Sequence, residues 1–277
     1  MPELPEVETM RRGVEPVVGM TIQAIEQPRL RVRPIAITPA LPAFRRRVAG
    51  RKIVGTDRVG KRVILELDSD DRIVFEPRMA GLVLMAEPPT REHLRLVFRL
   101  AKGKRTAELM YWDRRGLGSV RLVDEQEFER RYGAAKIGPD ALAISTEELR
   151  ERLSSSRRPI KVALLDQRAV AGIGNLYASE ILHLAKVDPR RTCDRLRRAE
   201  WKAIHAATVE ILEMAIEHEG STLGDGTYRN AQSKAGRYQN RHRVYGRKGQ
   251  PCPVCKKPVE RIVQAQRSTF FCPRCQK

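Results

Sequence analysis

The chain has 277 residues, and 41% of them are hydrophobic, which allows one large domain or two moderate domains with buried cores. A formal net charge of +19 predicts a polyanionic partner, because lysine and arginine neutralise phosphates and release their counterions. No apolar run approaches the ~18 residues of a membrane span, and no basic segment followed by an apolar stretch opens the chain, so neither a transmembrane helix nor a signal peptide is expected. An anionic membrane is a competing partner, but no long basic amphipathic helix favours it. We expect a cytoplasmic protein, associated with the nucleoid of a bacterium.

The N-terminus combines a helix start with a reactive amine. A helix is predicted over residues 5–16, because Pro5 suits a first helical position and acidic residues surround it. Removal of Met1 would leave the secondary amine of Pro2 beside the carboxyl group of Glu3. An α-amino group has a pKa of about 8, so a fraction is unprotonated at neutral pH and can attack an electrophilic carbon. The alternative is that these residues only start the helix.

The first half of the chain then has the pattern of strands. Residues 62–67 and 94–100 alternate in hydrophobicity or are rich in β-branched side chains, and turn-like segments at 68–71 and 101–104 follow them. Short, closely spaced strands predict an antiparallel sandwich or barrel. Residues 132–139, rich in small residues with glycine and proline, indicate a linker.

Beyond the linker the hydrophobic period becomes helical. Residues 145–148 start one helix, and residues 201–219 form another, closed by the glycine that follows. Two glycines within 171–175 can turn the chain tightly and place Asn175 at a helix N-terminus, where backbone N–H groups could hold a phosphate. Residues 220–240 are rich in glycine and small polar residues and are expected to form a mobile loop.

The cysteines gather at the C-terminus. Cys252 and Cys255 are separated by two residues, and Cys272 and Cys275 repeat this spacing after sixteen residues. This is close to the spacing of four-thiolate zinc sites, in which two Cys-x2-Cys turns hold one tetrahedral ion. Two disulfides are less favoured in a chain without secretion signals. We expect one structural zinc ion, and we expect Cys193 to be an ordinary thiol.

The N-terminal residues also carry a family resemblance. Residues 2–9 read Pro-Glu-Leu-Pro-Glu-Val-Glu-Thr, and Arg11-Arg12-Gly13 follow. This segment resembles the N-terminus of the formamidopyrimidine-DNA glycosylase and endonuclease VIII family, and later motifs occur in the family's order over essentially the whole chain. The resemblance implies an α+β fold with an N-terminal helix, an antiparallel β-sandwich, a helix-two-turn-helix domain and a C-terminal zinc-finger hairpin. We expect a catalytic domain over residues 1–133, a DNA-binding domain over 144–224 and a zinc finger over 236–277.

The resemblance further implies a bifunctional DNA glycosylase and abasic-site lyase of base excision repair. Pro2 would attack C1′ of a flipped, damaged nucleotide, Glu3 would transfer protons, and β and δ eliminations would cut the strand. Lys61 matches a lysine that reaches the phosphate and sugar of the lesion, although a solvated strand lysine is the alternative. An oxidised purine, 8-oxoguanine or a formamidopyrimidine, is the expected lesion, because residues 221–240 retain a loop of family length.

Flipping a nucleotide leaves a gap that the protein must fill. Met79, Arg115 and Leu117 match the family's gap-filling residues. Two motifs depart from the family pattern: residues 113–118 read Asp-Arg-Arg-Gly-Leu-Gly in place of Asp-Pro-Arg-Arg-Phe-Gly, and residues 76–79 read Glu-Pro-Arg-Met in place of His-x-Gly-Met. Leucine can wedge between bases, but it stacks less than phenylalanine.

Other matched positions concern DNA binding and support of the site. Lys161 and Asn175 match phosphate-gripping residues, and Arg267 matches a zinc-finger arginine that clamps the backbone with its planar fork. Glu6 and Glu180 match carboxylates that support the site, or they serve only as a helix cap or an ion-pair partner.

Two other functions remain open from the sequence. One is an endonuclease VIII-like glycosylase for oxidised pyrimidines, and the other is a non-catalytic zinc-ribbon protein that binds damaged DNA without a covalent intermediate. In each case the expected partner is damaged double-stranded DNA and not a membrane. We expect a monomer.

Overall fold

The computed structural model describes residues 2–29 and 32–277, and Met1 lies outside the described residues. The chain forms two compact units. The first, here called the N-terminal unit, comprises Met1–Gly133 and His218–Arg237; the second, the C-terminal unit, comprises Ala134–Glu217 and Tyr238–Lys277. The first boundary falls in the segment predicted to be a linker. The three-domain division predicted from sequence stays a prediction.

Helix α1 (Leu4–Val14) begins the N-terminal unit and continues as a 3-10 turn, η1 (Glu15–Val17). The α-helix is shorter than predicted because Pro16 has no N–H to bond the carbonyl one turn earlier. The helix packs against β3 and β4 of one sheet and β6 of the other. Its apolar side chains are buried there: Leu4, Val7, Met10 and Val14.

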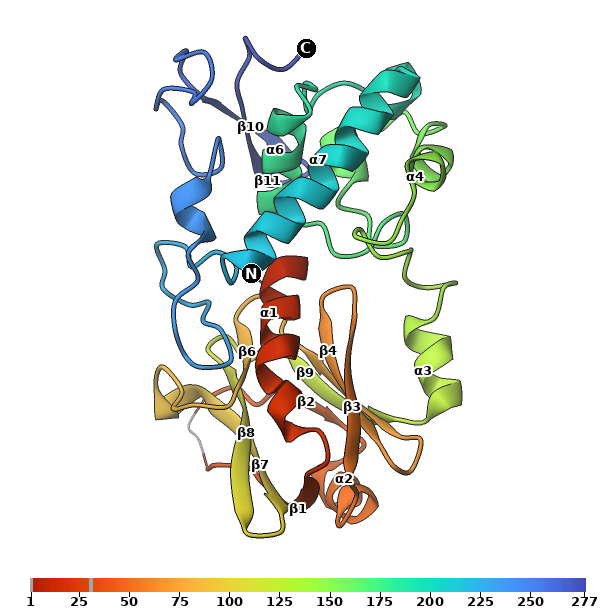
Figure 1. Cartoon of the computed structure of the whole chain (residues 1–277), viewed down its shortest axis with the longest axis vertical. Coiled ribbons are helices and arrows are strands. Elements are labelled where there is room, and N and C mark those ends of the chain that lie inside the picture. The colour runs from red at the N-terminus through yellow and green to blue at the C-terminus, as the bar shows by residue number, and fades with distance from the viewer. Residues whose placement is uncertain (1, 30–31) are drawn as a thin grey trace. The chain divides into compact units, whose positions relative to one another are not determined.

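Two sheets form the predicted sandwich (Figure 1). The four-stranded sheet has the order β1-β7-β8-β6, with β1 at Thr21–Glu26, β6 at Gly81–Leu84, β7 at Leu94–Lys102 and β8 at Arg105–Asp113. The five-stranded sheet has the order β2-β9-β5-β4-β3, with β2 at Ala36–Thr38, β3 at Ile53–Val59, β4 at Arg62–Leu67, β5 at Arg72–Glu76 and β9 at Ser119–Val123. The neighbours pair antiparallel apart from β2 and β9, which are parallel. The strands predicted over 62–67 and 94–100 are confirmed.

Aromatic rings from the two sheets meet in the core of the sandwich. The ring centroid of Phe75 on β5 lies 5.7 Å from that of Phe98 on β7 and 5.7 Å from that of Tyr111 on β8. Contacts of this kind add to the burial of apolar area and fix how the sheets face each other. Smaller elements complete the unit: α2 (Leu41–Val48), η2 (Arg91–His93) and α3 (Glu125–Tyr132).

The C-terminal unit is helical, as its sequence period predicts. It contains α4 (Thr146–Leu153), α5 (Ile160–Ala163), α6 (Asn175–Leu184), η3 (Cys193–Arg195), α7 (Arg198–Glu217) and η4 (Tyr238–Arg241). Ser145 caps α4, since its Oγ accepts from the N–H of Glu148 at 3.1 Å. Helix α7 ends two residues earlier than predicted, because the backbone is already left-handed at Glu219, before Gly220.

A two-stranded hairpin ends the chain. Strands β10 (Glu260–Gln264) and β11 (Arg267–Phe271) pair antiparallel, and β11 packs against α6. The two residues between them, Ala265 and Gln266, both have positive φ, the conformation of the tight turn that matches strand twist. This turn places Arg267 at the start of β11.

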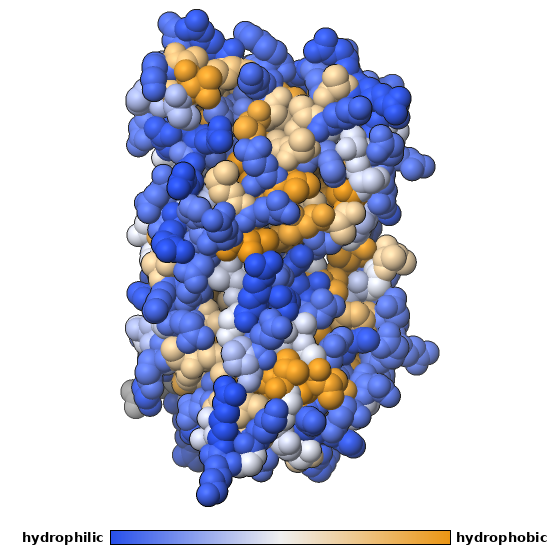
Figure 2. All heavy atoms as spheres, viewed as in Figure 1, coloured by the Kyte–Doolittle hydropathy of each residue, from blue (hydrophilic) through white to orange (hydrophobic). Residues whose placement is uncertain are grey.

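Hydrophilic side chains cover most of the face seen in Figure 2, and apolar residues gather there in smaller patches. In the described part of the chain, no helix is long and apolar enough to cross a membrane.

Candidate functional site

The predicted nucleophile and proton-transfer residue lie immediately before α1, and Glu3 is the N-cap of that helix. Pro2 and Glu3 are buried. The N–H of Glu3 donates to Glu6 Oε2 at 2.9 Å, and Glu6 Oε1 accepts from the N–H of Ser221 at 2.8 Å. Glu6 therefore fixes the backbone of Glu3 and joins it to the segment after α7, which agrees with a supporting role.

The turn between β3 and β4 carries Lys61, whose side chain is half-buried. Gly60, just before it, has a φ of +56°, which favours glycine. Arg58 holds this turn, since its Nη1 donates to the carbonyl of Gly60 at 3.1 Å and its Nε donates to Glu8 Oε2 on α1 at 3.1 Å. Arg58 thus connects α1, the helix that follows Pro2, to the turn that carries Lys61.

The predicted gap-filling residues lie on two turns. Met79 is 40% exposed and Leu117 is 38% exposed, which is unusual for large apolar side chains in this chain. Arg115 is also exposed. Arg78, which stands where the family pattern has glycine, has a left-handed φ of +52°, so the turn keeps a glycine-like backbone without glycine.

Asp113 shapes the second turn. Its Oδ1 accepts from the N–H of Arg115 at 3.0 Å and its Oδ2 accepts from the N–H of Gly118 at 2.7 Å. Gly116 has a φ of +63°, and a Cβ there would lie 2.8 Å from the carbonyl oxygen of Arg33. The backbone of this turn therefore favours the glycine found here over the arginine of the family pattern.

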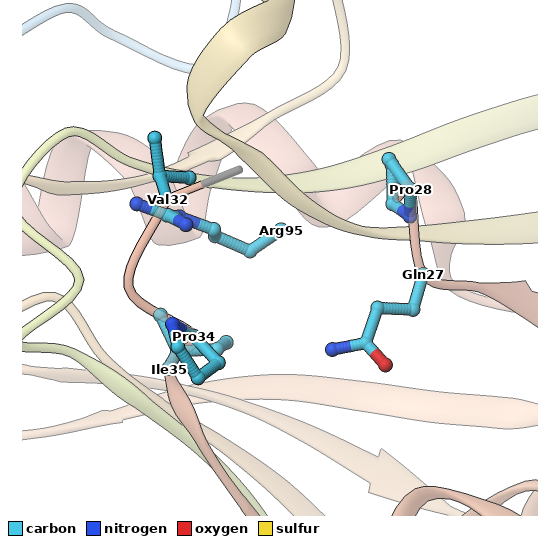
Figure 3. Close-up of a pocket in the computed structure, with 6 residues that line it drawn as sticks. All are labelled: Gln27, Pro28, Val32, Pro34, Ile35 and Arg95. Atoms are coloured by element: carbon cyan, nitrogen blue, oxygen red, sulfur yellow. The ribbon is translucent and has the colours of Figure 1, made fainter. Parts of the chain in front are cut away.

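Arg95 anchors the same turn from β7. It is buried, donates twice to the carbonyl of Asp113 at 2.9 and 2.7 Å, and donates to the carbonyl of Arg33 at 2.8 Å. Figure 3 shows its side chain extending toward Val32 in a small pocket. We assign no ligand to this pocket; its lining residues are Gln27, Pro28, Val32, Pro34, Ile35 and Arg95.

Asn175 joins the phosphate-binding candidates of the C-terminal unit. It begins α6, as predicted, but its side chain does not cap that helix. Its Nδ2 donates to the carbonyl of Ser268 at 2.9 Å, and its Oδ1 accepts from Nζ of Lys161. Lys161 is fully buried, whereas Arg267, next to Ser268, is exposed. The structure thus brings Asn175 close to the backbone beside Arg267, and the buried Lys161 contacts Asn175 from the interior of the unit.

Glu180 holds the segment before the zinc hairpin. Its buried carboxylate accepts from the backbone N–H groups of Arg243 at 2.8 Å, Val244 at 3.0 Å and Tyr245 at 2.8 Å. Burial raises the pKa of Glu180, and the three hydrogen bonds offset part of that effect. Glu180 therefore supports the backbone of the C-terminal unit.

The four C-terminal cysteines form one cluster. Their sulfur atoms all lie within 4.8 Å of one another, and the Sγ atoms of Cys255 and Cys272 are 3.4 Å apart, those of Cys252 and Cys275 3.9 Å. A tetrahedral zinc ion with Zn–S bonds of about 2.3 Å separates its sulfurs by about 3.8 Å. The cluster therefore fits a zinc ion.

His183 on α6 is a neighbour of this cluster that the sequence reasoning missed. Its Nε2 lies 3.4 Å from Cys252 Sγ. Burial lowers the pKa of His183 to about 4, so the ring is neutral at physiological pH. One sequence signal could have found it: a histidine three residues after Glu180, between the apolar residues Leu182 and Leu184. Sequence reasoning also missed the structural roles of Arg58 and Tyr111, because no local motif distinguishes either residue from the other residues of its strand.

These features define a class: a DNA-processing protein with a β-sandwich headed by Pro2 and Glu3, a helical unit and a four-cysteine hairpin. Residues 1–120 match the formamidopyrimidine-DNA glycosylase N-terminal domain, residues 137–226 match its H2TH domain, and residues 249–277 match the zinc finger found in FPG and IleRS. The chain belongs to the formamidopyrimidine-DNA glycosylase family.

Individual relatives agree over the full length. The chain is 40% identical to the formamidopyrimidine-DNA glycosylase of Chloroflexus aurantiacus, over all of this chain and 98% of that protein. It resembles a Lactococcus lactis FPG variant solved with Fapy-dG containing DNA (TM-score 0.88, 33% identity, all of both chains). A MutM structure in complex with carbocyclic 8-oxo-G containing DNA gives a TM-score of 0.87 at 33% identity, again over all of both chains.

The family membership confirms several predictions. The fold class is confirmed, and so is the enzyme class, a DNA glycosylase and abasic-site lyase that acts on damaged DNA. A zinc-finger domain with a four-cysteine cluster is confirmed as well. The alternative of a non-catalytic binding protein is no longer supported.

Proposed function

We propose that this protein excises oxidised purines from duplex DNA and cuts the strand at the resulting abasic site. The observation that carries the proposal is the buried Pro2-Glu3 end of α1, where the backbone of Glu3 is fixed by Glu6. With Met1 removed, the nitrogen of Pro2 forms a bond to C1′ as the glycosidic bond breaks. Opening of the sugar ring then gives an iminium ion, an electron sink for the steps that follow.

Elimination completes the reaction. The iminium ion acidifies the neighbouring C2′ position, so loss of that proton breaks the bond to the 3′ phosphate, and a second elimination releases the 5′ phosphate. Glu3 transfers protons in ring opening and elimination. Lys61 binds the phosphate and sugar of the lesion, a role favoured by the half-buried position in which Arg58 holds its turn.

The proposed lesion is an oxidised purine. Residues 221–240 keep a loop that ends in Lys234-Ala235-Gly236-Arg237-Tyr238, similar to the family's Lys-Pro-Gly-Tyr-Phe. This loop is anchored in the N-terminal unit, since the carbonyl of Ala231 accepts from the N–H of Met85 at 2.7 Å. The related structures described above hold a formamidopyrimidine and an 8-oxoguanine analogue. An oxidised pyrimidine is the competing lesion.

DNA would be held by exposed basic and polar groups and opened by the two turns. Asn175 and Arg267 would contact phosphates flanking the lesion, and Lys161 would act through Asn175. Met79 and Leu117 would fill the gap with Arg115. Their exposure in the free protein favours this role.

One zinc ion would hold the hairpin. Cys252, Cys255, Cys272 and Cys275 would bind it, and the ion would neutralise the thiolates and fix the strand that carries Arg267. We propose that the enzyme acts as a monomer on chromosomal DNA in the cytoplasm, with its charge of +19 drawing it to the duplex.

Borohydride trapping tests the nucleophile. Reduction during reaction with abasic-site DNA is expected to link the chain to DNA through Pro2, detected by mass spectrometry of the terminal peptide. Pro2→Gly, or a chain that retains Met1, is expected to lose most of this product. Undiminished trapping with Met1 retained contradicts the assignment. Parallel excision assays with 8-oxoguanine and with an oxidised pyrimidine decide between the two lesions.

A further inference from the structure

The hydroxyl of Tyr111 lies where the two gap-filling turns meet. Tyr111 is on β8 and is fully buried. Its Oη donates to the carbonyl of Glu76 at 3.0 Å, immediately before the turn that carries Met79. That turn is closed by the N–H of Gly81, which donates to the carbonyl of Pro77 at 2.8 Å.

Two glycines bring the backbone of both turns against the same hydroxyl. A Cβ on Gly118, at the end of the Leu117 turn, would lie 1.9 Å from Tyr111 Oη and 2.7 Å from the carbonyl oxygen of Glu76. A Cβ on Gly81, at the end of the Met79 turn, would lie 2.6 Å from Tyr111 Oη. A side chain at either position would displace the tyrosine. The backbones of both turns therefore pack against the same atom, Tyr111 Oη.

The side chain of Glu76 adds a second connection between the turns. It is buried; its Oε2 accepts from Ser119 Oγ at 3.1 Å and its Oε1 accepts from Arg62 Nε at 2.7 Å. Burial alone would raise the pKa of Glu76, but Arg62, Arg78 and Ser119 together outweigh burial and lower it. The charged carboxylate therefore ties the start of the Met79 turn to the residue that follows the Leu117 turn.

We propose that Tyr111 is a positioning residue that couples the two turns, so that Met79 and Leu117 enter DNA as one body. The inference rests on the proposed function, because it requires these residues to fill the gap of a flipped nucleotide. If the two turns move as one body, the conformational entropy of ordering them is lost in a single step. If they move independently, this entropy is lost once for each side chain that is inserted into DNA. The coupling acts on flipping, which a preformed abasic site makes easier.

A double-mutant cycle tests the coupling. Single-turnover excision of 8-oxoguanine from duplex is measured for Met79→Ala, Leu117→Ala and the pair, each with Tyr111 and with Tyr111→Phe. With Tyr111 present, we expect the paired change to cost clearly less than the product of the single losses; with Tyr111→Phe, the losses should multiply. Tyr111→Phe alone should slow excision about tenfold, the effect of one buried hydrogen bond. Its lyase rate at a preformed abasic site should change less than about twofold, since little flipping cost remains.

A control separates positioning from stability. Thr208 Oγ1 donates to the carbonyl of Ile204 at 2.8 Å, so Thr208→Val also removes a buried hydroxyl bond, but in the C-terminal unit. We expect it to leave excision unchanged. The coupling is overturned if, with Tyr111 present, the loss of excision rate in the double variant equals the product of the two single losses. It is also overturned if Tyr111→Phe slows excision and lyase action equally. If neither Met79→Ala nor Leu117→Ala slows excision while trapping at Pro2 persists, the gap-filling assignment fails, and the coupling fails with it. Loss of trapping at Pro2 instead identifies failure of the proposed chemistry.

Discussion

Arg58 donates through Nε to Glu8 Oε2 at 3.1 Å, although fifty residues separate them in the chain. Burial alone would raise the pKa of Glu8, but the hydrogen bonds from Arg11 and Arg12 and the charges of Arg11 and Arg58 together outweigh burial and lower it. Glu8 is therefore charged at neutral pH. The pair connects α1, which directly follows Pro2 and Glu3, to the turn that carries Lys61.

We expect Glu8→Gln to destabilise the protein by about 2 kcal/mol at pH 7, the range for a buried hydrogen bond to a charged group. Because the pKa of Glu8 is lowered in the fold, its stabilising effect is present above the ordinary glutamate pKa of about 4.3 and is lost as pH falls through the lower folded value. Urea unfolding at a series of pH values should show the two proteins converging below about pH 4.

Glu15→Gln is the matched control on the same face. Its side chain is 61% exposed, and its Oε2 lies 3.6 Å from Arg11 Nη1. A surface pair of this kind contributes about 0.5 kcal/mol or less. A stability difference for Glu8→Gln that does not change with pH would show that the charge of Glu8 is not what stabilises the fold.

Loss of zinc is expected to unfold the C-terminal hairpin and to leave the β-sandwich folded. We expect the protein to contain one zinc ion, and Cys272→Ser or a chelator to remove it together with DNA binding, because metal binding and folding are coupled in so small a hairpin. Circular dichroism should report retained β-structure. Cys193→Ser, which changes a buried thiol outside the cluster, should keep the zinc. Active protein without zinc contradicts the prediction.

Local patterns were enough to predict part of this structure. The strand at 62–67, the cap at Ser145 and the cysteine cluster each depend on residues close together in sequence. The bond from Asn175 to Ser268 spans 93 residues and depends on how β11 packs on α6, so sequence reasoning could place Asn175 on its helix but not foresee its partners. The same holds for the buried position of Lys161.

Salt dependence tests the proposed role of Arg267 at a DNA phosphate. Removing one phosphate-binding side chain should lower the slope of log affinity against log salt by about 0.9 on duplex DNA, because one counterion fewer is released on binding. We therefore expect this change for Arg267→Ala in binding assays at several salt concentrations. Arg99→Ala is the control, since Arg99 pairs with Glu26 at 2.9 Å and has no proposed role in DNA binding. An unchanged slope for Arg267→Ala removes this residue from the DNA interface.

Leu117 tests the proposed wedge. Flipping costs a few kcal/mol and costs least where the base is absent, so a weakened wedge matters most on an intact, paired lesion. We expect Leu117→Ala to slow excision from duplex far more than lyase action at a preformed abasic site. Leu117→Phe should improve excision or sharpen discrimination between opposite bases, because an aromatic ring stacks better than leucine.

The neighbouring glycine supplies the contrast for this prediction. Gly116→Arg also restores a family residue, but Gly116 has a φ of +63° and its Cβ would lie 2.8 Å from the carbonyl oxygen of Arg33, so we expect it to distort the turn and slow excision. Single-turnover rates on one lesion opposite each of the four bases, with an abasic control, measure all three variants. Equal losses on the lesion and the abasic site for Leu117→Ala would mean that Leu117 serves packing or general DNA binding, because a wedge must act on the step that the abasic site makes easier.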